Sequence, residues 1–148
     1  MPWVAHSPTI RLECARVADA PEVFALLWEC RHEIPLADTF DSPEHVEWVR
    51  DHCRRKRFFV VRYEGAIVGA MLLKPTELFY IAVREGFRQR GIGRRFVRYA
   101  EKRWGTLTAK AHQGNHRSIA LLKSEGFRPD PVRALRSEWE AFIWTRTK

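Results

Sequence analysis

The chain of 148 residues is 45% hydrophobic and 30% charged and carries a net charge of +8 at pH 7. This balance is typical of a globular protein, so residues 1–148 are interpreted as one domain in which residues 1–9 form a loose N-terminal segment. No apolar run approaches the roughly 20 residues that a membrane-spanning helix needs, and no signal-peptide pattern opens the chain.

The first predicted elements are a strand and a helix. Ile10–Cys14 alternates weakly between polar and apolar residues and predicts the strand. Asp19 is expected to cap the helix, with Pro21 in its first turn and Glu22 completing a capping box. The apolar stripe that follows predicts a helix extending to about Glu33.

A second helix and three strands come next. Ser42–Glu44 carries the signals of a helix start. Two apolar runs, Phe58–Tyr63 and Ala66–Leu73, predict strands joined by a tight hairpin, and Gly69 is expected to mark a bulge in the second. Leu78–Val83 predicts a further strand.

The basic stretch Arg88–Arg95 joins this strand to a helix that is predicted to run from Ile92 to near Trp104. The first amides of a helix have no internal partners, and the helix dipole adds positive charge there. Gly91 and Gly93 would let a ligand oxygen approach the backbone closely. The stretch therefore predicts a seat for a phosphate or pyrophosphate, with a solvated basic turn as the alternative. The complete patterns of a nucleotide P-loop or a dinucleotide fingerprint are missing.

The last elements complete a mixed α/β fold. Thr106–His112 predicts a strand, and Asn115 is expected to cap a helix that stops at Gly126. Arg128–Leu135 predicts an edge strand at best, because prolines interrupt it, and Trp139–Thr145 predicts a last strand. The expected order is βααβββαβαββ, a single mixed sheet with helices on both faces.

Two motifs in this order resemble the GNAT (Gcn5-related N-acetyltransferase) family. Ala82–Gly93 matches the family's Arg/Gln-x-x-Gly-x-Gly/Ala acyl-CoA loop, and Asn115–Phe127 is similar to its Asn…Ala-Leu-Tyr-Glu-Lys-Leu-Gly-Phe segment. Ile10–Leu12 and Ala18–Ala20 also resemble the family's first strand and helix entry. The resemblance implies the acyl-CoA N-acyltransferase fold and an enzyme that transfers acetyl from acetyl-CoA, as co-substrate, to a primary amine of a small molecule or peptide by direct attack.

The resemblance also implies where acetyl-CoA would bind. Backbone groups of Ile81, Ala82 and Val83 would pair with the pantetheine arm like an added strand. The loop would hold the pyrophosphate with Arg88, Gln89, Arg90, Gly91, Ile92, Gly93 and Arg94. Asn115 and Ser118 would contact the arm or support its groove.

The sequence departs from the family at the position of a tyrosine that often protonates the leaving CoA thiolate. Leu122 stands there and cannot donate a proton, so water or Ser118 would have to substitute. The general base has three alternatives, namely Glu77, Tyr80 and His112, and each also has an ordinary structural interpretation. The loss of the tyrosine favours a second hypothesis, a catalytically weak module that binds CoA.

The remaining expectations concern the acceptor and the surroundings. By family analogy Glu33, Asp38 and Asp41 would attract a cationic amine. Three scattered cysteines predict free thiols in a reducing cytoplasm, and the histidine spacing predicts no metal site. The basic charge keeps a nucleic-acid-binding domain as a third, less favoured hypothesis, because no recognised nucleic-acid motif accompanies it. No membrane partner is expected, and a homodimer is left open.

Overall fold

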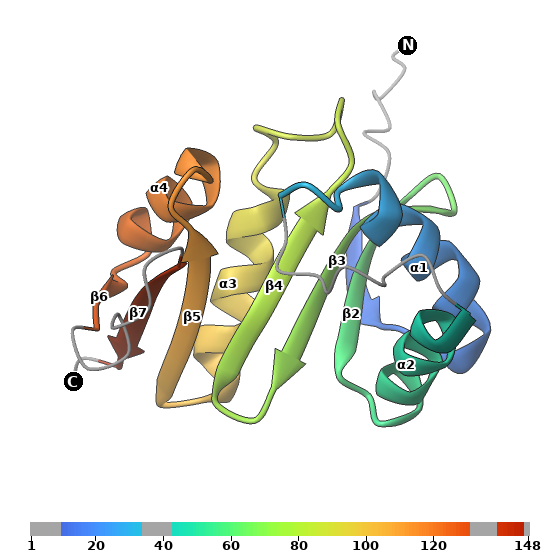
Figure 1. The fold of residues 1–148 in the computed structure, drawn as a ribbon, viewed down its shortest axis with the longest axis horizontal. Coiled ribbons are helices and arrows are strands. Elements are labelled where there is room, and N and C mark those ends of the chain that lie inside the picture. The colour runs from blue at the N-terminus through green and yellow to red at the C-terminus, as the bar shows by residue number, and fades with distance from the viewer. Residues whose placement is uncertain (1–9, 34–42, 131–138, 147–148) are drawn as a thin grey trace, which may run out of the picture.

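The structure is a computed structural model that describes residues 10–33, 43–130 and 139–146 (Figure 1). Within these ranges seven strands form one sheet in the order β1-β2-β3-β4-β5-β7-β6, parallel at β4–β5 and antiparallel at the other pairs. The elements are β1 (Arg11–Cys14), the short 3-10 helix η1 (Val17–Asp19), α1 (Ala20–Glu29), α2 (Pro43–Arg54), β2 (Phe58–Tyr63), β3 (Ala66–Lys74), β4 (Glu77–Val83), α3 (Ile92–Arg103), β5 (Thr106–His112), α4 (His116–Ser124), β6 (Arg128–Pro129) and β7 (Trp139–Thr145). The predicted element order and mixed sheet are confirmed.

Helices cover both faces of the sheet, as predicted (Figure 1). On one face α1 and α2 pack against Phe58, Val60 and other buried strand residues. On the opposite face α3 packs against Phe59, Val61 and their neighbours. Successive side chains of β2 therefore enter different cores, which is the alternation that a strand buried on both faces requires. None of the helices in the described ranges is long and apolar enough to span a membrane.

The hairpin between β2 and β3 has the backbone that its sequence predicts. Glu64 and Gly65 have φ angles of 49° and 84°, the left-handed pair of a two-residue turn, and Tyr63 lies opposite Ala66. A register shift at the end of β2 places a bulge beside Gly69, as expected. A Cβ atom on Gly69 would lie 3.0 Å from Cγ2 of Ile92 and 3.1 Å from Cε2 of Phe96, so this glycine lets α3 pack close to the sheet.

The predicted capping box at Asp19 and Glu22 is wrong. Asp19 already has helical backbone angles, so its carboxylate makes no capping bond to α1 and accepts from the Arg16 N–H at 2.8 Å. It also pairs with the Arg62 guanidinium at 2.7 Å. Burial alone would raise the pKa of Asp19, but these donors lower it below its usual value. Glu22 instead accepts from the backbone N–H of Ile67 at 2.7 Å and ties α1 to β3.

Helix α1 is shorter than its apolar stripe predicts. It ends at Glu29. The backbone hydrogen bonds after it span three residues, with the Arg31 N–H donating to Trp28 O and the Glu33 N–H to Cys30 O. These i to i−3 bonds form a turn that leaves the helix axis. The turn directs Glu33 toward the loop after β4, a contact that helical periodicity could not predict.

A bulge in β4 shapes the centre of the molecule. Leu73 lies opposite Leu78 and Leu72 opposite Tyr80, so Phe79 is the extra residue. Leu78 consequently packs with α3, whereas Tyr80 packs on the α1 and α2 side. The parallel pairing of β4 with β5 stops after Leu78↔Ala109, so the β5-facing edge of β4 beyond it has no strand partner in the described residues.

Some sequence predictions lie outside the described residues. They concern residues 1–9, Asp38, Asp41 and the part of the Arg128–Leu135 strand after residue 130. The part that is described, β6, is a short strand at the end of the sheet, which agrees with the predicted edge strand.

Candidate active site

The loop between β4 and α3 has a backbone conformation that suits anion binding. Gln89 and Gly91 adopt left-handed conformations, with φ angles of 63° and 81°, and Gly91 is the N-cap of α3. The first internal bond of α3 runs from the Arg95 N–H to Gly91 O at 3.0 Å. The first-turn amides that precede Arg95 have no acceptor within the helix. Left-handed residues that alternate with right-handed ones direct successive backbone N–H groups into one concavity. Among the described residues no acidic side chain lies in the first turn of α3.

The two glycines of the loop have different roles. A Cβ atom on Gly91 would meet nothing within 4 Å, so the space beside it is open to a ligand. A Cβ atom on Gly93 would lie 2.9 Å from Cδ2 of Leu121. Gly93 therefore brings the start of α3 against α4, and close packing, in addition to ligand access, explains why it has no side chain.

A cavity of about 310 Å³ lies between this loop, the end of β4 and the start of α4. Its wall contains most of the predicted cofactor-binding residues: Ile81, Ala82, Val83, Arg88, Gln89, Gly91, Ile92, Gly93, Arg94, Asn115 and Ser118. Arg90 is not part of this wall, because its guanidinium lies over the Phe87 ring, 5.2 Å from the centroid. The size and the mixture of apolar and basic residues suit a cofactor arm that ends in phosphates.

Sequence reasoning missed four residues of the wall: Cys30, Phe87, Arg117 and Leu121. In the sequence Cys30 is one of the apolar residues at helical spacing that predict the first helix, and only the tertiary fold brings its Sγ to 3.7 Å from Val83 O. Burial raises the pKa of the Cys30 thiol, so it remains a protonated, weak donor. Arg117 lies inside the second motif, and its position near the helix start was the available signal.

A narrow compartment continues from the cavity between the diverging strands β4 and β5. Its volume is about 20 Å³, and it shares Glu33, Ile81, Asn115, Ser118 and Leu121 with the larger cavity. Its own lining is Leu78, Tyr80, Ala109, Lys110, Ala111, His112 and Leu122. The compartment therefore begins where the edge of β4 loses its strand partner and ends among residues of β5 and α4.

Asn115 connects the walls of the cavity with both ends of its side chain. Its Oδ1 accepts from the Ser118 N–H at 3.1 Å, which confirms the predicted helix cap. Its Nδ2 donates to Glu33 O at 2.8 Å. Because both ends bond protein groups, the geometry favours support of the groove over direct contact with a ligand.

The three candidate bases occupy different environments. Tyr80 is 4% exposed, packs against Phe58 and has a hydroxyl without a hydrogen-bond partner. Burial raises its pKa well above the usual value, so the phenol stays protonated. His112 is exposed, and its Nδ1 accepts from the Gly114 N–H at 3.1 Å. Glu77 is half-buried at the start of β4, opposite Thr108, outside both cavity walls.

Leu122 is 3% exposed and lies in the narrow compartment, so the position that often carries the family's acid is apolar here. In the described ranges no group of three or more His, Cys, Asp or Glu side chains gathers closely enough to hold a metal ion.

A model of the acetyltransferase (GNAT) family matches residues 20–127. The chain therefore belongs to the GNAT acetyltransferase family. No curated protein sequence matches the chain.

Solved structures share the fold at low sequence identity. A GNAT-family acetyltransferase of Bacillus cereus ATCC 10987 is 13% identical with a TM-score of 0.74, covering 95% of this chain and 99% of that chain. The PaiA N-acetyltransferase of Thermoplasma acidophilum, in complex with coenzyme A, is 13% identical with a TM-score of 0.70, covering 93% and 99%. N-acetylglutamate synthase of Neisseria gonorrhoeae, complexed with coenzyme A and N-acetyl-glutamate, is 15% identical with a TM-score of 0.74, covering 97% of this chain but 37% of its own.

Proposed function

We propose that this protein transfers acetyl from acetyl-CoA to a primary amine by direct attack of the amine on the thioester. The observation that carries the proposal is the left-handed loop at the start of α3. It shares a cavity wall with the end of β4, where the β4 edge has no strand partner among the described residues. Family membership and the coenzyme A bound in two related structures support it. Acetyl-CoA supplies the activated acyl group, and the protein supplies binding, orientation and proton handling.

The cavity suggests how the chain would hold acetyl-CoA. Amides from Gln89 to Arg94 would bind the diphosphate at the helix N-terminus. Backbone groups of Ile81–Val83 that face β5 would pair with the amides of the pantetheine arm. The thioester would then reach the narrow compartment, whose lining includes the apolar side chains of Leu78 and Leu122.

Proton transfer from the amine constrains the choice of base. Tyr80 does not suit the role, because its raised pKa keeps it protonated at neutral pH. Nδ1 of His112 already accepts a hydrogen bond from the Gly114 N–H, so this nitrogen is occupied. Glu77 retains acceptor oxygens, and it would act through water, since it lies outside the cavity walls. An acceptor with a pKa near 8 needs little help, because its neutral form costs only about 1 kcal/mol at pH 7, against about 4–5 kcal/mol for a lysine-like amine.

The leaving thiolate needs no dedicated acid. A CoA thiol resembles free cysteine, whose pKa is about 8.5, so it can leave as a thiolate and take a proton from water. We therefore expect the Leu122→Tyr variant to keep at least the wild-type kcat. Its free energy of unfolding should fall by roughly 1–3 kcal/mol, because a tyrosine ring is larger than the leucine side chain and the compartment has a volume of only about 20 Å³. Steady-state kinetics and thermal unfolding of both proteins would check this. A folded variant with far lower kcat would contradict it.

Release of free thiol from acetyl-CoA, measured with a panel of primary amines, tests the proposed function. Amine-dependent release above the hydrolysis background is the expected result. Tight CoA binding without release of free thiol for any amine would favour a CoA-binding module. The absence of a proton donor at Leu122 is the feature that supports this alternative. Affinity for RNA or DNA that falls steeply with salt and ignores acetyl-CoA would favour a nucleic-acid-binding domain.

A further inference from the structure

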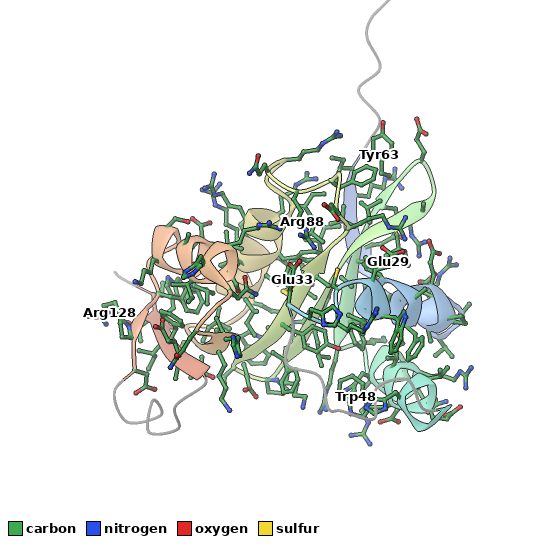
Figure 2. The ribbon with its side chains drawn as sticks, turned by 45° about the horizontal axis from the view of Figure 1, so that its top comes forward. Glu29, Glu33, Trp48, Tyr63, Arg88 and Arg128 are labelled. Atoms are coloured by element: carbon green, nitrogen blue, oxygen red, sulfur yellow. The ribbon has the colours of Figure 1, made fainter. Side chains whose placement is uncertain are left out.

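An acidic side chain stands in the wall of the cavity proposed to bind an anion. Oε1 of Glu33 lies 2.9 Å from Nη1 of Arg88, and Oε2 lies 4.0 Å from Nη1 of Arg117. Glu33 and Arg88 lie close together near the centre of Figure 2, one from the turn after α1 and the other from the loop after β4. One carboxylate therefore pairs with arginines from two walls of the same cavity.

The same contacts hold Arg88 across the edge of β4. Its Nε donates to Val83 O at 2.9 Å, and its Nη2 lies 4.0 Å from Cys30 Sγ. The Arg88 side chain is 18% exposed, so its guanidinium is directed inward onto protein acceptors. In this arrangement the Arg88 guanidinium contacts groups of the protein itself. One of them, Val83 O, lies on the strand edge that the pantetheine arm would need.

A diphosphate that approaches the loop is attracted by arginines and repelled by a nearby carboxylate. We propose that Glu33 is a built-in competitor of the cofactor diphosphate: its carboxylate occupies Arg88 and Arg117 in the free protein and yields them when the anion binds. This inference rests on the proposed function and deepens it. It gives Glu33 a role in cofactor affinity, in contrast to the amine contact predicted from the sequence.

The role belongs to the side chain alone. The backbone of Glu33 is anchored separately, because its carbonyl accepts from Asn115 Nδ2 at 2.8 Å. Glu33→Gln keeps that bond and the side-chain shape and removes only the negative charge. The variant therefore separates competition for the arginines from support of the cavity wall.

Glu29, the last residue of α1, provides a matched control four residues before Glu33. It pairs with Arg84 at 3.2 Å, and its side chain is 51% exposed, close to the 44% of Glu33. Figure 2 shows Glu29 on α1, and neither it nor Arg84 belongs to the cavity wall. Glu29→Gln makes the same change in net charge and also removes a carboxylate that pairs with an arginine. It changes no residue of the cavity wall.

Calorimetric titration of the two variants and the wild type with CoA, and separately with inorganic pyrophosphate, tests the proposal. Glu33→Gln is expected to lower the Kd of both ligands about three- to tenfold at low ionic strength, and salt at about 0.5 M should shrink this gain. Glu29→Gln is expected to change either Kd by less than about twofold.

An unchanged or raised Kd in Glu33→Gln would overturn the proposal, and so would an effect confined to the acceptor KM. A wild-type protein that ignores CoA at millimolar concentration would overturn the proposed function itself. The pyrophosphate titrations would still decide whether Glu33 competes with an anion, so the two failures are distinguishable.

Discussion

Gly91→Glu is expected to abolish measurable CoA binding, raising Kd by roughly 100-fold or more. The open space beside Gly91 would be filled by a carboxylate, which both blocks the seat and repels the diphosphate. Calorimetry with CoA, together with circular dichroism to verify folding, would measure the effect. Gly93→Glu is less informative, because a side chain there would first collide with Leu121.

Gly86→Glu is the matched control for this experiment. Gly86 lies in the same loop, has a φ angle of 94° and also has open space beside it, so the backbone strain and the added charge are similar. It is not part of the cavity wall, and its variant should bind CoA nearly as the wild type does. Equal affinities of the Gly91 and Gly86 variants would remove the diphosphate from this loop.

Phe96→Ala is expected to lower the free energy of unfolding by about 3–5 kcal/mol. Phe96 is fully buried, and its ring lies against Gly69 of β3. Deleting the ring leaves a void under the helix whose first turn forms the proposed anion seat. Chemical denaturation of variant and wild type would measure the loss.

A half-buried phenylalanine on the other face serves as the comparison for Phe96. Phe24 packs against the core beneath α1 but keeps part of its surface in solvent, so Phe24→Ala should cost clearly less than Phe96→Ala. A loss below about 1 kcal/mol for Phe96→Ala would contradict the packing described for α3.

Periodicity and turn chemistry predicted the element order, because local signals decide them. The hairpin turn at Glu64 and Gly65, and the cap made by Asn115, depend on neighbours in the chain and were predictable from the sequence. The roles of Asp19 and Glu22 were not, because their partners Arg62 and Ile67 are distant in sequence. The Asp19 carboxylate bonds the nearby Arg16 amide as well as the Arg62 guanidinium on β2, the Glu22 carboxylate bonds the backbone of β3, and neither side chain caps α1.

The site was predictable only in part for the same reason. The glycine loop is a continuous motif, so its position after β4 followed from the sequence. The bulge at Phe79, which turns Tyr80 into the opposite core, has no local signal, and neither does the point at which the β4–β5 pairing ends. The pairing of Glu33 with Arg88 depends on where α1 ends, which the apolar stripe placed too late.

The proposed function depends on binding of the cofactor diphosphate by the N-terminus of α3. Titration of the wild-type protein with acetyl-CoA, in the absence and presence of inorganic pyrophosphate, tests this binding most directly. We expect saturable binding of acetyl-CoA that pyrophosphate weakens by occupying the same amides. Absence of binding at millimolar acetyl-CoA, or binding that pyrophosphate leaves untouched, would contradict it.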